Sequence, residues 1–387
     1  MIKVFEGFAG IGSQRMALEN IGVEFEVVGI SEVDKNALLA YDIIHNEQVD
    51  VSEEKTKEEM IQEFKNKNIA YNFSTGKSQI PRKEEDVRSL YNAHIRSKNY
   101  GDITRINPND LPDFDLFTYS FPCKNISITG RQAGLDEGSS TQSSLLWECR
   151  KIIINKKPKY LLMENVKNLV GKKHKPNFDK WCQELEDLGY TNYWDILNGK
   201  NFGVPQNRER VMMVSILNDD KNFIMPLKSN HKQKQIIDIL EKNVDISYYK
   251  NKPFIFTDKF YSNLDLRINE LQQVAATIEN CYEQGRRVYS INGICPTVTA
   301  MGGGNLEPKI LEYPKNKDFF KNNNIYHNEG YVVRKLTPLE CWRLMGYKDE
   351  YYYKVKELGL SKHALYERAG RGIVVPMLEE IFKNLFL

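Results

Sequence analysis

The chain has 387 residues, of which 41% are hydrophobic and 27% charged, and its mean hydropathy is −0.54. This balance is typical of a globular protein with a sizeable core, and it excludes disordered and collagen-like chains. Lys and Arg total 54 against 52 Asp and Glu, a formal net charge of +2. Any nucleic-acid surface must therefore be a local cleft instead of a basic field over the whole protein.

The cysteines show neither CxxC pairs nor the Cys/His spacing of a metal site. No secretory segment is recognisable, and no apolar run approaches the roughly 18 to 20 residues of a membrane helix. We therefore expect a cytoplasmic protein without metal, disulfide or membrane contact. The six cysteines are Cys123, Cys149, Cys182, Cys281, Cys295 and Cys341.

The first 44 residues have a βαβα pattern. An apolar strand over residues 2–8 enters a glycine-rich turn at 8–13, and a helical pattern runs from there to residue 21. A second strand at 24–30 precedes the acidic Glu32 and a helix over 34–44. A ligand could approach the backbone at Gly10 and Gly12, with Glu32 placed to accept ribose hydroxyls. Taken alone, this turn fits an empty βα connection as well as a nucleotide site, and NAD would be the default ligand.

Three further strands are predicted at 116–119, 160–163 and 211–216, in alternation with helices. This order predicts an α/β fold with a parallel or mixed sheet. Residues 48–97 form a Lys/Glu/Asn-rich, mainly helical stretch that we expect to be a solvated insertion. We assign residues 1–217 to a catalytic and cofactor-binding domain, 218–290 to a smaller recognition domain, and 291–387 to a recognition-lobe motif with C-terminal helices that return to the catalytic domain.

Side chains suited to attack on an electron-poor ring follow several of these strands. Cys123 comes just after one strand, Glu164 ends another, and Arg208 and Arg210 precede a third. A thiolate can add to carbon, a carboxyl group can hydrogen-bond a ring nitrogen, and an arginine can hold a carbonyl oxygen or a phosphate. Singly, the cysteine is better explained as a small buried residue, and the charged residues equally well as salt bridges. The combination at one sheet edge favours a catalytic site.

The ordered motifs resemble the cytosine-C5 DNA methyltransferase family over residues 8 to about 387. The matching segments are FAGIG (8–12), GDIT (101–104), FPCKNISITG (121–130), SSLL (143–146), ENV (164–166), QNRER (206–210), PTVTA (296–300) followed by glycines 302–304, and RKLTPLECWRLMG (334–346).

The resemblance implies a Rossmann-like fold that binds S-adenosyl-methionine, a small target-recognition lobe at about 218–289, and monomeric action on double-stranded DNA. The cofactor-binding residues that it implies are Phe8, Gly10, Gly12, Glu32 toward the ribose, Asp102 toward adenine, Pro122 and Leu145. The DNA-binding residues that it implies are Ser127, Thr129, Gln206, Thr297, Thr299 and Arg334.

The resemblance also implies a mechanism. The target cytosine is flipped out of the duplex, because its ring cannot react within the stack. Cys123 adds to C6, Glu164 hydrogen-bonds N3, and C5 takes the alkyl group before the C5 proton and the thiolate leave. Arg210 contacts the base carbonyl, and Arg208 supports the backbone or a loop.

The sequence departs from the family pattern at several positions. Lys124 stands where glutamine is usual, and Arg371, in Gly370-Arg371-Gly372, stands where asparagine is usual. Val33 replaces a common aromatic residue, and Thr129 a common serine or alanine, which we interpret as tolerated drift. Two cations near a sulfonium donor should repel it by about a kcal/mol or more. One hypothesis is therefore a donor with a carboxylate on the transferred carbon, carboxy-S-adenosyl-methionine, held by Lys124 and Arg371 to give 5-carboxymethylcytosine.

Several alternatives stay open. Both cations could contact DNA phosphates and leave ordinary methylation intact, the two changes could be engineered, or the protein could be an impaired DNA-binding relative. A transfer-RNA cytosine-C5 methyltransferase of the same fold shares the catalytic motifs, although the sizeable lobe after residue 218 favours DNA. An NAD oxidoreductase would not need the thiol, carboxyl and arginine set. The motifs are compatible with a restriction-modification enzyme, an orphan enzyme and a bacterial or phage origin.

Overall fold

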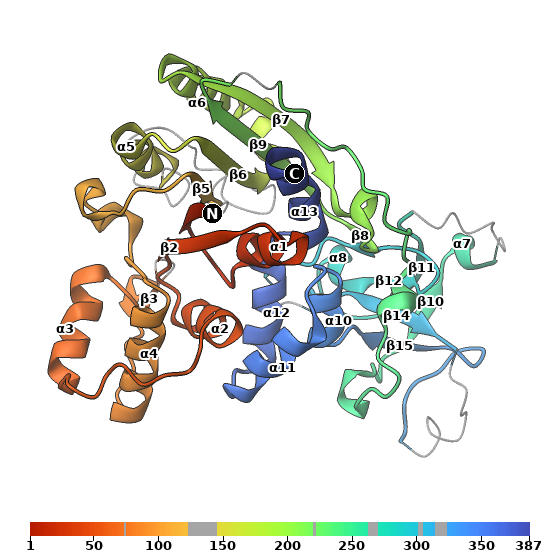
Figure 1. The fold of residues 1–387 in the computed structure, drawn as a ribbon. Helices are drawn as coiled ribbons and strands as arrows, with labels where there is room; N and C mark the ends of the chain where they lie inside the picture. The colour runs from red at the N-terminus through yellow and green to blue at the C-terminus, as the bar shows by residue number, and fades with distance from the viewer. Residues whose placement is uncertain (73–74, 123–144, 220–221, 262–269, 301–304, 314–322) are drawn as a thin grey trace. The chain divides into compact units, whose positions relative to one another are not determined.

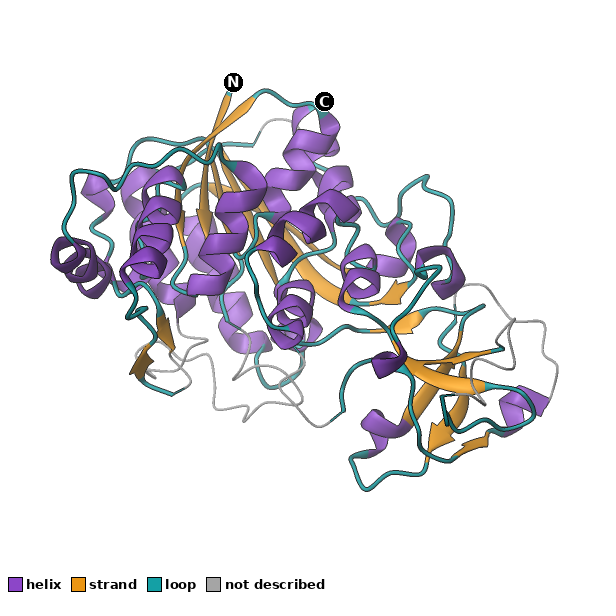
Figure 2. Ribbon diagram, turned by 90° about the horizontal axis from the view of Figure 1, so that it is seen from below, coloured by secondary structure: helices purple, strands orange, loops and turns teal. Residues whose placement is uncertain are grey.

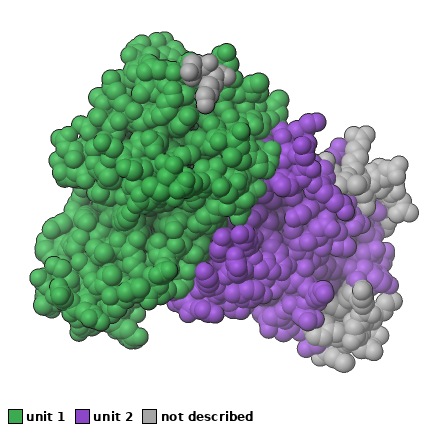
Figure 3. All heavy atoms as spheres, in the orientation of Figure 1, with its two compact units in different colours: residues 1–197, 209–227, 378–387 green, residues 198–208, 228–377 purple. Residues whose placement is uncertain are grey.

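The structure is a computed structural model that describes residues 1–72, 75–122, 145–219, 222–261, 270–300, 305–313 and 323–387. The chain forms two compact units (Figure 3). The first unit contains residues 1–197, 209–227 and 378–387, and the second contains residues 198–208 and 228–377. Each unit is described by itself below.

The first unit is built on a six-stranded sheet in the order β2-β1-β5-β6-β9-β7 (Figure 1). Strands β2, β1, β5 and β6 are parallel to one another, whereas β9 runs antiparallel to β6. The strands are β1 (Ile2–Gly7), β2 (Phe25–Ser31), β5 (Leu116–Tyr119), β6 (Tyr160–Val166), β7 (Tyr190–Asn198) and β9 (Glu209–Leu217). The mixed α/β, Rossmann-like fold predicted from the sequence is confirmed.

Helices of the first unit follow the strands along the chain. They are α1 (Ser13–Ile21), α2 (Lys35–His45), α3 (Lys57–Lys67), α4 (Glu84–Arg96), α5 (Leu146–Lys156), α6 (Lys175–Asp187) and, from residue 378, α13 (Val375–Phe386), with a hairpin of β3 (Tyr71–Asn72) and β4 (Lys77–Ser78) and 3-10 turns at Ile103–Arg105, Pro108–Asp110 and Lys167–Val170. The predicted start of the second helix is accurate, because Asp34 caps α2 by accepting from the backbone N–H groups of Asn36 and Ala37.

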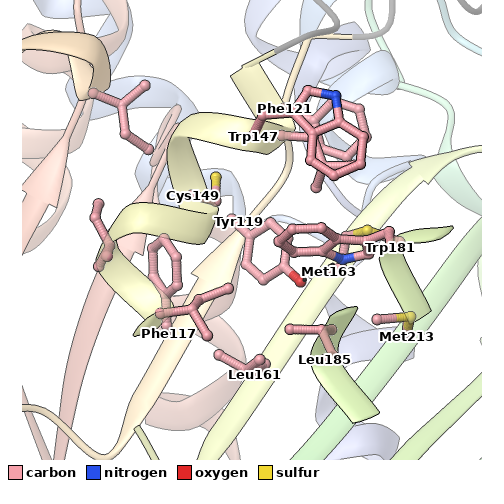
Figure 4. Packing of buried hydrophobic residues seen from close by; sticks show 14 of the residues in the cluster. Phe117, Tyr119, Phe121, Trp147, Cys149, Leu161, Met163, Trp181, Leu185 and Met213 are labelled. Carbon is pink, nitrogen blue, oxygen red and sulfur yellow. Dashed lines mark hydrogen bonds between the residues drawn. The ribbon is translucent and has the colours of Figure 1, made fainter. Parts of the chain in front are cut away.

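One face of the sheet packs against α5 and α6 through aromatic side chains (Figure 4). Trp181 of α6 meets Trp147 of α5 edge to face at 5.8 Å, and its indole N–H donates to the Tyr119 hydroxyl at 3.3 Å. Phe117 and Tyr119 of β5 stack at 5.1 Å. Edge-to-face and offset ring pairs add to the stabilisation that comes from burying their area. This core fixes the central strands whose ends carry the candidate site.

Residues 48–97 do not form a solvated insertion, and that prediction is wrong. Met60 and Phe64 of α3 and Val87 and Leu90 of α4 are fully buried. They belong to one apolar cluster with residues of β2 and α2, including Tyr41. Their apolar positions recur at helical spacing, a signal that the surrounding Lys, Glu and Asn residues obscured. The segment is an integral part of the first unit.

The second unit contains a five-stranded sheet in the order β10-β11-β12-β14-β15 (Figure 2). Its strands are β10 (Phe254–Phe256), β11 (Gln273–Thr277), β12 (Arg287–Ser290), β14 (Lys309–Glu312) and β15 (Val332–Lys335), and a separate pair is formed by β8 (Gln206–Asn207) and β13 (Cys295–Pro296). Its helices are α7 (Asp258–Tyr261), α8 (Glu283–Arg286), α10 (Pro338–Arg343), α11 (Asp349–Glu357) and α12 (Lys362–Arg371), with 3-10 turns at Gly199–Phe202, Ile236–Ile239 and Ile246–Tyr248.

The unit boundaries differ from the domain boundaries expected from the sequence. Residues 198–208 belong to the second unit because β8 pairs with β13, which lies nearly 90 residues later. Of the expected C-terminal return, residues 378–387 belong to the first unit. In the described part of the chain, no helix is long and apolar enough to cross a membrane.

Candidate active site

The first turn opens at the carboxyl end of the parallel strands. Strand β1 lies between β2 and β5, and the chain passes from β1 to β2 on one side before it returns to β5 on the other. A sheet of this type binds ligands at such a reversal of strand order. Gly10 has φ +59° and a Cβ placed there would meet nothing within 4 Å, so the backbone is open. Gly12 has φ +79° and caps α1, and a Cβ there would lie 2.3 Å from the His45 ring. The neighbouring Phe8 is half-buried against the aromatic core.

Glu32 lies directly after β2, and three backbone N–H groups hold its carboxylate. Gly10 donates to Oε2 at 2.9 Å, and Val33 and Asp34 each donate to Oε1 at 2.8 Å. Asn99 fixes the Glu32 backbone, because its side chain accepts from the Glu32 N–H at 3.0 Å and donates to the Glu32 carbonyl at 3.0 Å. Asn99 carries no local sequence signal for this role, since its partner lies 67 residues away.

Asp102 is 3% exposed. Asn99, which holds the Glu32 backbone, also accepts from the N–H of Gly101 at 3.0 Å, and this bridge brings Asp102 near Glu32. Its Oδ1 accepts from the Thr104 N–H and hydroxyl, and its Oδ2 accepts from Asn68 at 2.7 Å. An ionised carboxylate offers about four acceptor positions, so one remains on Oδ2. The structure thus brings Gly10, Glu32 and Asp102 to one edge of the sheet.

The segment before the predicted nucleophile is tied to β6. The side-chain amide of Asn165 donates to the Phe121 carbonyl at 3.0 Å, and the Asn165 side chain is 2% exposed. Pro122 and Leu145 are half-buried, and Leu145 packs against the aromatic core. Four predicted site residues lie outside the described residues, namely Cys123, Lys124, Ser127 and Thr129.

Glu164 and Arg210 form an ion pair, with the guanidinium Nε 2.9 Å from Oε1 of the carboxylate. Their side chains are 12% and 13% exposed. Strand pairing explains the contact: Glu164 is opposite Met212 and Val166 is opposite Arg210, so the pair is a diagonal neighbour on one face. Because Asn165 lies next to Glu164, β6 presents the carboxylate and holds the chain two residues before Cys123.

In the second unit, the Arg208 side chain is buried and hydrogen-bonds backbone carbonyl groups of two separate segments. Its guanidinium donates to the carbonyl of Val298 at 2.8 Å and to those of Gly370 and Gly372 at 2.9 and 2.8 Å. These contacts join the PTVTA loop to the end of α12 and fit the supporting role expected for Arg208. A buried arginine in this place positions other groups and offers no face to a reacting base.

Gln206 and Arg334 do not fit the predicted DNA contacts. The Gln206 side chain is fully buried, accepts from the Val298 N–H at 2.9 Å and donates to the Leu344 carbonyl at 2.8 Å. Arg334 is also fully buried, and its guanidinium binds both carboxylate oxygens of Glu340 at 2.8 Å. Both side chains hold the second unit together, so we remove them from the DNA-binding set.

Thr299, Thr297 and Arg371 remain accessible in the second unit. Thr299 is exposed, whereas the half-buried Thr297 donates its hydroxyl hydrogen to the Asn207 carbonyl at 2.6 Å. Arg371 is 49% exposed and forms an ion pair at 2.5 Å with Glu367, one turn earlier on α12. Thr297 and Thr299 stay in the proposed DNA-binding set.

The comparisons with known proteins bear on this arrangement of strand ends and motifs. The pattern of the C-5 cytosine-specific DNA methylase family matches residues 2–73 and 81–387. The chain belongs to this family. Type II methyltransferase M2.ScrFI of Lactococcus lactis subsp. cremoris is 41% identical over 100% of this chain and 99% of its own length. Orphan methyltransferase M.SssI of Spiroplasma monobiae is 33% identical over 99% of this chain and 97% of its own.

Solved structures show the same fold as this C-5 cytosine-specific DNA methylase. Dnmt2 methyltransferase of S. pombe matches with a TM-score of 0.59 at 18% identity, covering 100% of this chain and 98% of its own. A putative DNA modification methyltransferase encoded within an E. coli prophage matches with a TM-score of 0.58 at 15% identity, covering 100% and 99%. Methyltransferases of this family use S-adenosyl-methionine.

The edge of the sheet in this family member fits such a cofactor. The backbone at Gly10 is open, and the Glu32 carboxylate lies beside it at the same edge, where a carboxylate suits ribose hydroxyls. Among the described residues, no group of three or more His, Cys, Asp or Glu side chains is arranged to bind a metal.

The buried carboxyl group of Glu6, at the end of β1, makes the stability of the folded protein depend on pH. Burial raises the pKa of Glu6 to about 7, against the opposing effects of the Tyr41 hydroxyl, which donates at 2.6 Å, and of Arg15, while Glu19 adds to the rise. Because folding raises the pKa of Glu6, its contribution to the stability of the folded protein is complete below its unfolded pKa near 4.5. That contribution is lost as pH rises through 7, which lowers the free energy of unfolding by roughly 3 kcal/mol.

Glu6→Gln should therefore be more stable than wild type at pH 8 and similar to it at pH 4.5. Urea unfolding across this range measures the difference, with Glu24→Gln as the control, because the Glu24 side chain is 83% exposed. Equal pH dependence in Glu6→Gln and wild type would contradict the buried, ionising Glu6.

Proposed function

We propose that this protein transfers a methyl group from S-adenosyl-methionine to C5 of cytosine in double-stranded DNA. The observation that carries the proposal is the Glu164–Arg210 pair on β6 and β9, adjacent to Asn165, which anchors the segment leading to Cys123. This geometry supports a carboxyl group and a thiol that act on the same ring. The family membership supports the reaction type.

The proposed residues divide the chemistry between them. The Cys123 thiolate forms a bond to C6 of a flipped cytosine, and the electron pair moves into the ring toward C5 and N3. A proton held between the Glu164 carboxyl group and N3 stabilises this charge. Arg210 fixes the orientation of Glu164 and is proposed to reach the base carbonyl.

S-adenosyl-methionine supplies the methyl group when it is bound. We propose that Glu32 and Asp102 hold its ribose and adenine, with Phe8, Gly10, Gly12, Pro122 and Leu145 around it. Once C5 carries the methyl group, its proton leaves to solvent base and the C6–sulfur bond breaks, which regenerates the thiolate and the aromatic ring. Arg208 positions the PTVTA loop, whose Thr297 and Thr299 are proposed to contact DNA.

The nature of the transferred group depends on Lys124 and Arg371. Arg371 already forms an ion pair with Glu367, so its charge does not require a carboxylate on the donor. This contact favours ordinary 5-methylcytosine over 5-carboxymethylcytosine. We therefore place carboxy-S-adenosyl-methionine second and make it an outcome of the test.

The test is the mass of the modified nucleoside. Purified protein is incubated with genomic duplex DNA or with transfer RNA, each with S-adenosyl-methionine or carboxy-S-adenosyl-methionine, and the digest is analysed by mass spectrometry. The proposal predicts 5-methylcytosine in DNA. A carboxymethyl product that is lost in Arg371→Asn would establish the carboxylated donor, whereas a product confined to RNA, or none, would overturn the DNA assignment.

Glu164→Gln should lower the single-turnover rate of methylation by about 10²- to 10³-fold, because glutamine cannot supply the proton at N3. Binding of duplex DNA should change little. Glu209→Gln is a matched control, since Glu209 lies on the same strand as Arg210 and pairs with Lys167 at the surface. Equal rates for Glu164→Gln and Glu209→Gln would contradict the proposed role of Glu164.

A further inference from the structure

The C-terminal end of α3, in the segment 48–97, lies against the turn that carries Asp102. The Asp102 N–H donates to the Lys67 carbonyl at 2.8 Å. Arg105, three residues later, donates to the carbonyls of Lys65 and Asn66 at 2.6 and 3.0 Å. The last carbonyls of a helix lack partners within it and are its electronegative end, so these donors complete α3. The segment and the Asp102 turn are thus one hydrogen-bonded structure.

The same stretch also contacts the residue that follows Glu32. Ala70 donates its N–H to the Val33 carbonyl at 2.9 Å. Residues 65–70 therefore bind backbone both on Val33, directly after Glu32, and on Asp102, which the resemblance places toward adenine. Phe64, Ile69 and Ala70 are at most 1% exposed, so this stretch is anchored in the apolar cluster of α2, α3 and α4.

Close packing leaves the Asp102 turn little freedom. Gly101 has φ +77°, and a Cβ placed on it would lie 2.3 Å from the Lys67 carbonyl oxygen. Such an approach is open to glycine alone, because any larger residue would have to displace backbone. The register between α3 and the turn is therefore fixed.

Asn68 makes the side-chain contact to the carboxylate. It ends α3 in the left-handed conformation with φ 55°, which asparagine tolerates, and its amide donates to Asp102 Oδ2 at 2.7 Å. Thr104 donors hold Oδ1 on the other side. Together they fix the plane of the carboxylate and leave one acceptor position, on the oxygen that Asn68 contacts.

We propose that residues 65–70, at the end of α3, set the affinity for the adenine end of the cofactor, and that Asn68 is the positioning residue which orients Asp102 toward the adenine amino group. This inference rests on the proposed function, because it requires that the cofactor contain adenine. Removal of the Asn68 amide should weaken binding by about 10-fold, the effect expected for one hydrogen bond to a charged group.

Isothermal titration tests the proposal with S-adenosyl-homocysteine and S-inosyl-homocysteine, in which a carbonyl replaces the amino group. The variant is Asn68→Gly, which preserves the left-handed backbone and removes the amide. The control is Asn66→Ala, because Asn66 lies two residues earlier, is exposed, and contacts Gln62 through its side chain. Circular dichroism verifies that both variants are folded.

In Asn68→Gly, the dissociation constant for S-adenosyl-homocysteine should rise about 10-fold. The dissociation constant for S-inosyl-homocysteine and the KM for DNA should be unchanged. Asn66→Ala should match wild type. Equal weakening of the binding of both ligands, or no weakening of either, would overturn the role of Asn68. The proposed function would still stand in that case, provided that the wild type binds S-adenosyl-homocysteine. If wild type binds neither ligand, the proposed function fails, and this inference fails with it.

Discussion

Cys123→Ser is expected to reduce cytosine methylation by at least about 10³-fold, because a serine hydroxyl is not ionised at neutral pH and adds to C6 far more slowly than a thiolate. Binding of duplex DNA should stay within about twofold of wild type, since the two side chains have nearly the same size. Incorporation of labelled methyl groups measures the rate, and a gel-shift titration measures binding.

Cys182→Ser is the control for this variant. Burial raises the pKa of the Cys182 thiol to about 12, so it is a neutral thiol in the folded protein at pH 7. It lies on α6 and contacts the Met213 sulfur. The control should methylate at the wild-type rate. Full methylation activity in Cys123→Ser would contradict the proposed covalent mechanism.

Arg334→Met is expected to have the largest effect on stability, a loss of about 3 to 5 kcal/mol. The substitution leaves the Glu340 carboxylate fully buried without its cation, and also removes the donor to Glu312 at 2.8 Å. Glu340 is further committed to capping α10 through the Thr337 N–H, so it has no other geometry to adopt. Urea unfolding measures the loss.

Three further variants separate structure from DNA recognition. Glu283→Gln should cost less than about 0.5 kcal/mol, because the Glu283 side chain is 74% exposed and pairs with Arg287 in solvent. Arg334→Met combined with Glu340→Met should recover part of the stability, since no buried charge is left unpaired. If an Arg334→Lys protein were stable but did not bind DNA, that result would instead support the DNA contact predicted for Arg334 from the sequence.

The strands that carry the site could be predicted from local sequence. Residues 2–7 and 116–119 are short apolar runs before a turn, and both became parallel strands at the expected positions. Asp34 and Thr337 are N-caps whose signals lie within three residues, so the starts of α2 and α10 were also predictable. The resemblance then assigned cofactor contacts to Glu32 and Asp102, and the strand pattern predicted Glu164 at the same sheet edge as Cys123, Arg208 and Arg210.

The features that the sequence did not reveal depend on partners far along the chain. Asn99 reaches Glu32 across 67 residues, and Arg208 reaches Gly370 across 162. Arg334 differs, because its partner Glu340 lies only six residues later, but the sequence does not show that this pair is buried. Such networks satisfy buried polar groups, and their members are set by tertiary structure and not by periodicity.

Covalent trapping on a fluorinated duplex tests whether Cys123 bonds to the target cytosine. Duplex DNA is copied with 5-fluorocytosine in place of every cytosine and incubated with the protein and S-adenosyl-methionine. Once C5 carries the methyl group, fluorine stands where the departing proton would be, so the ring cannot expel the thiolate. The proposed mechanism predicts an adduct that requires the methyl donor, resists denaturation, and maps by peptide mass spectrometry to Cys123. Methylation of ordinary DNA without any adduct on the fluorinated duplex, or an adduct on another residue, would contradict it.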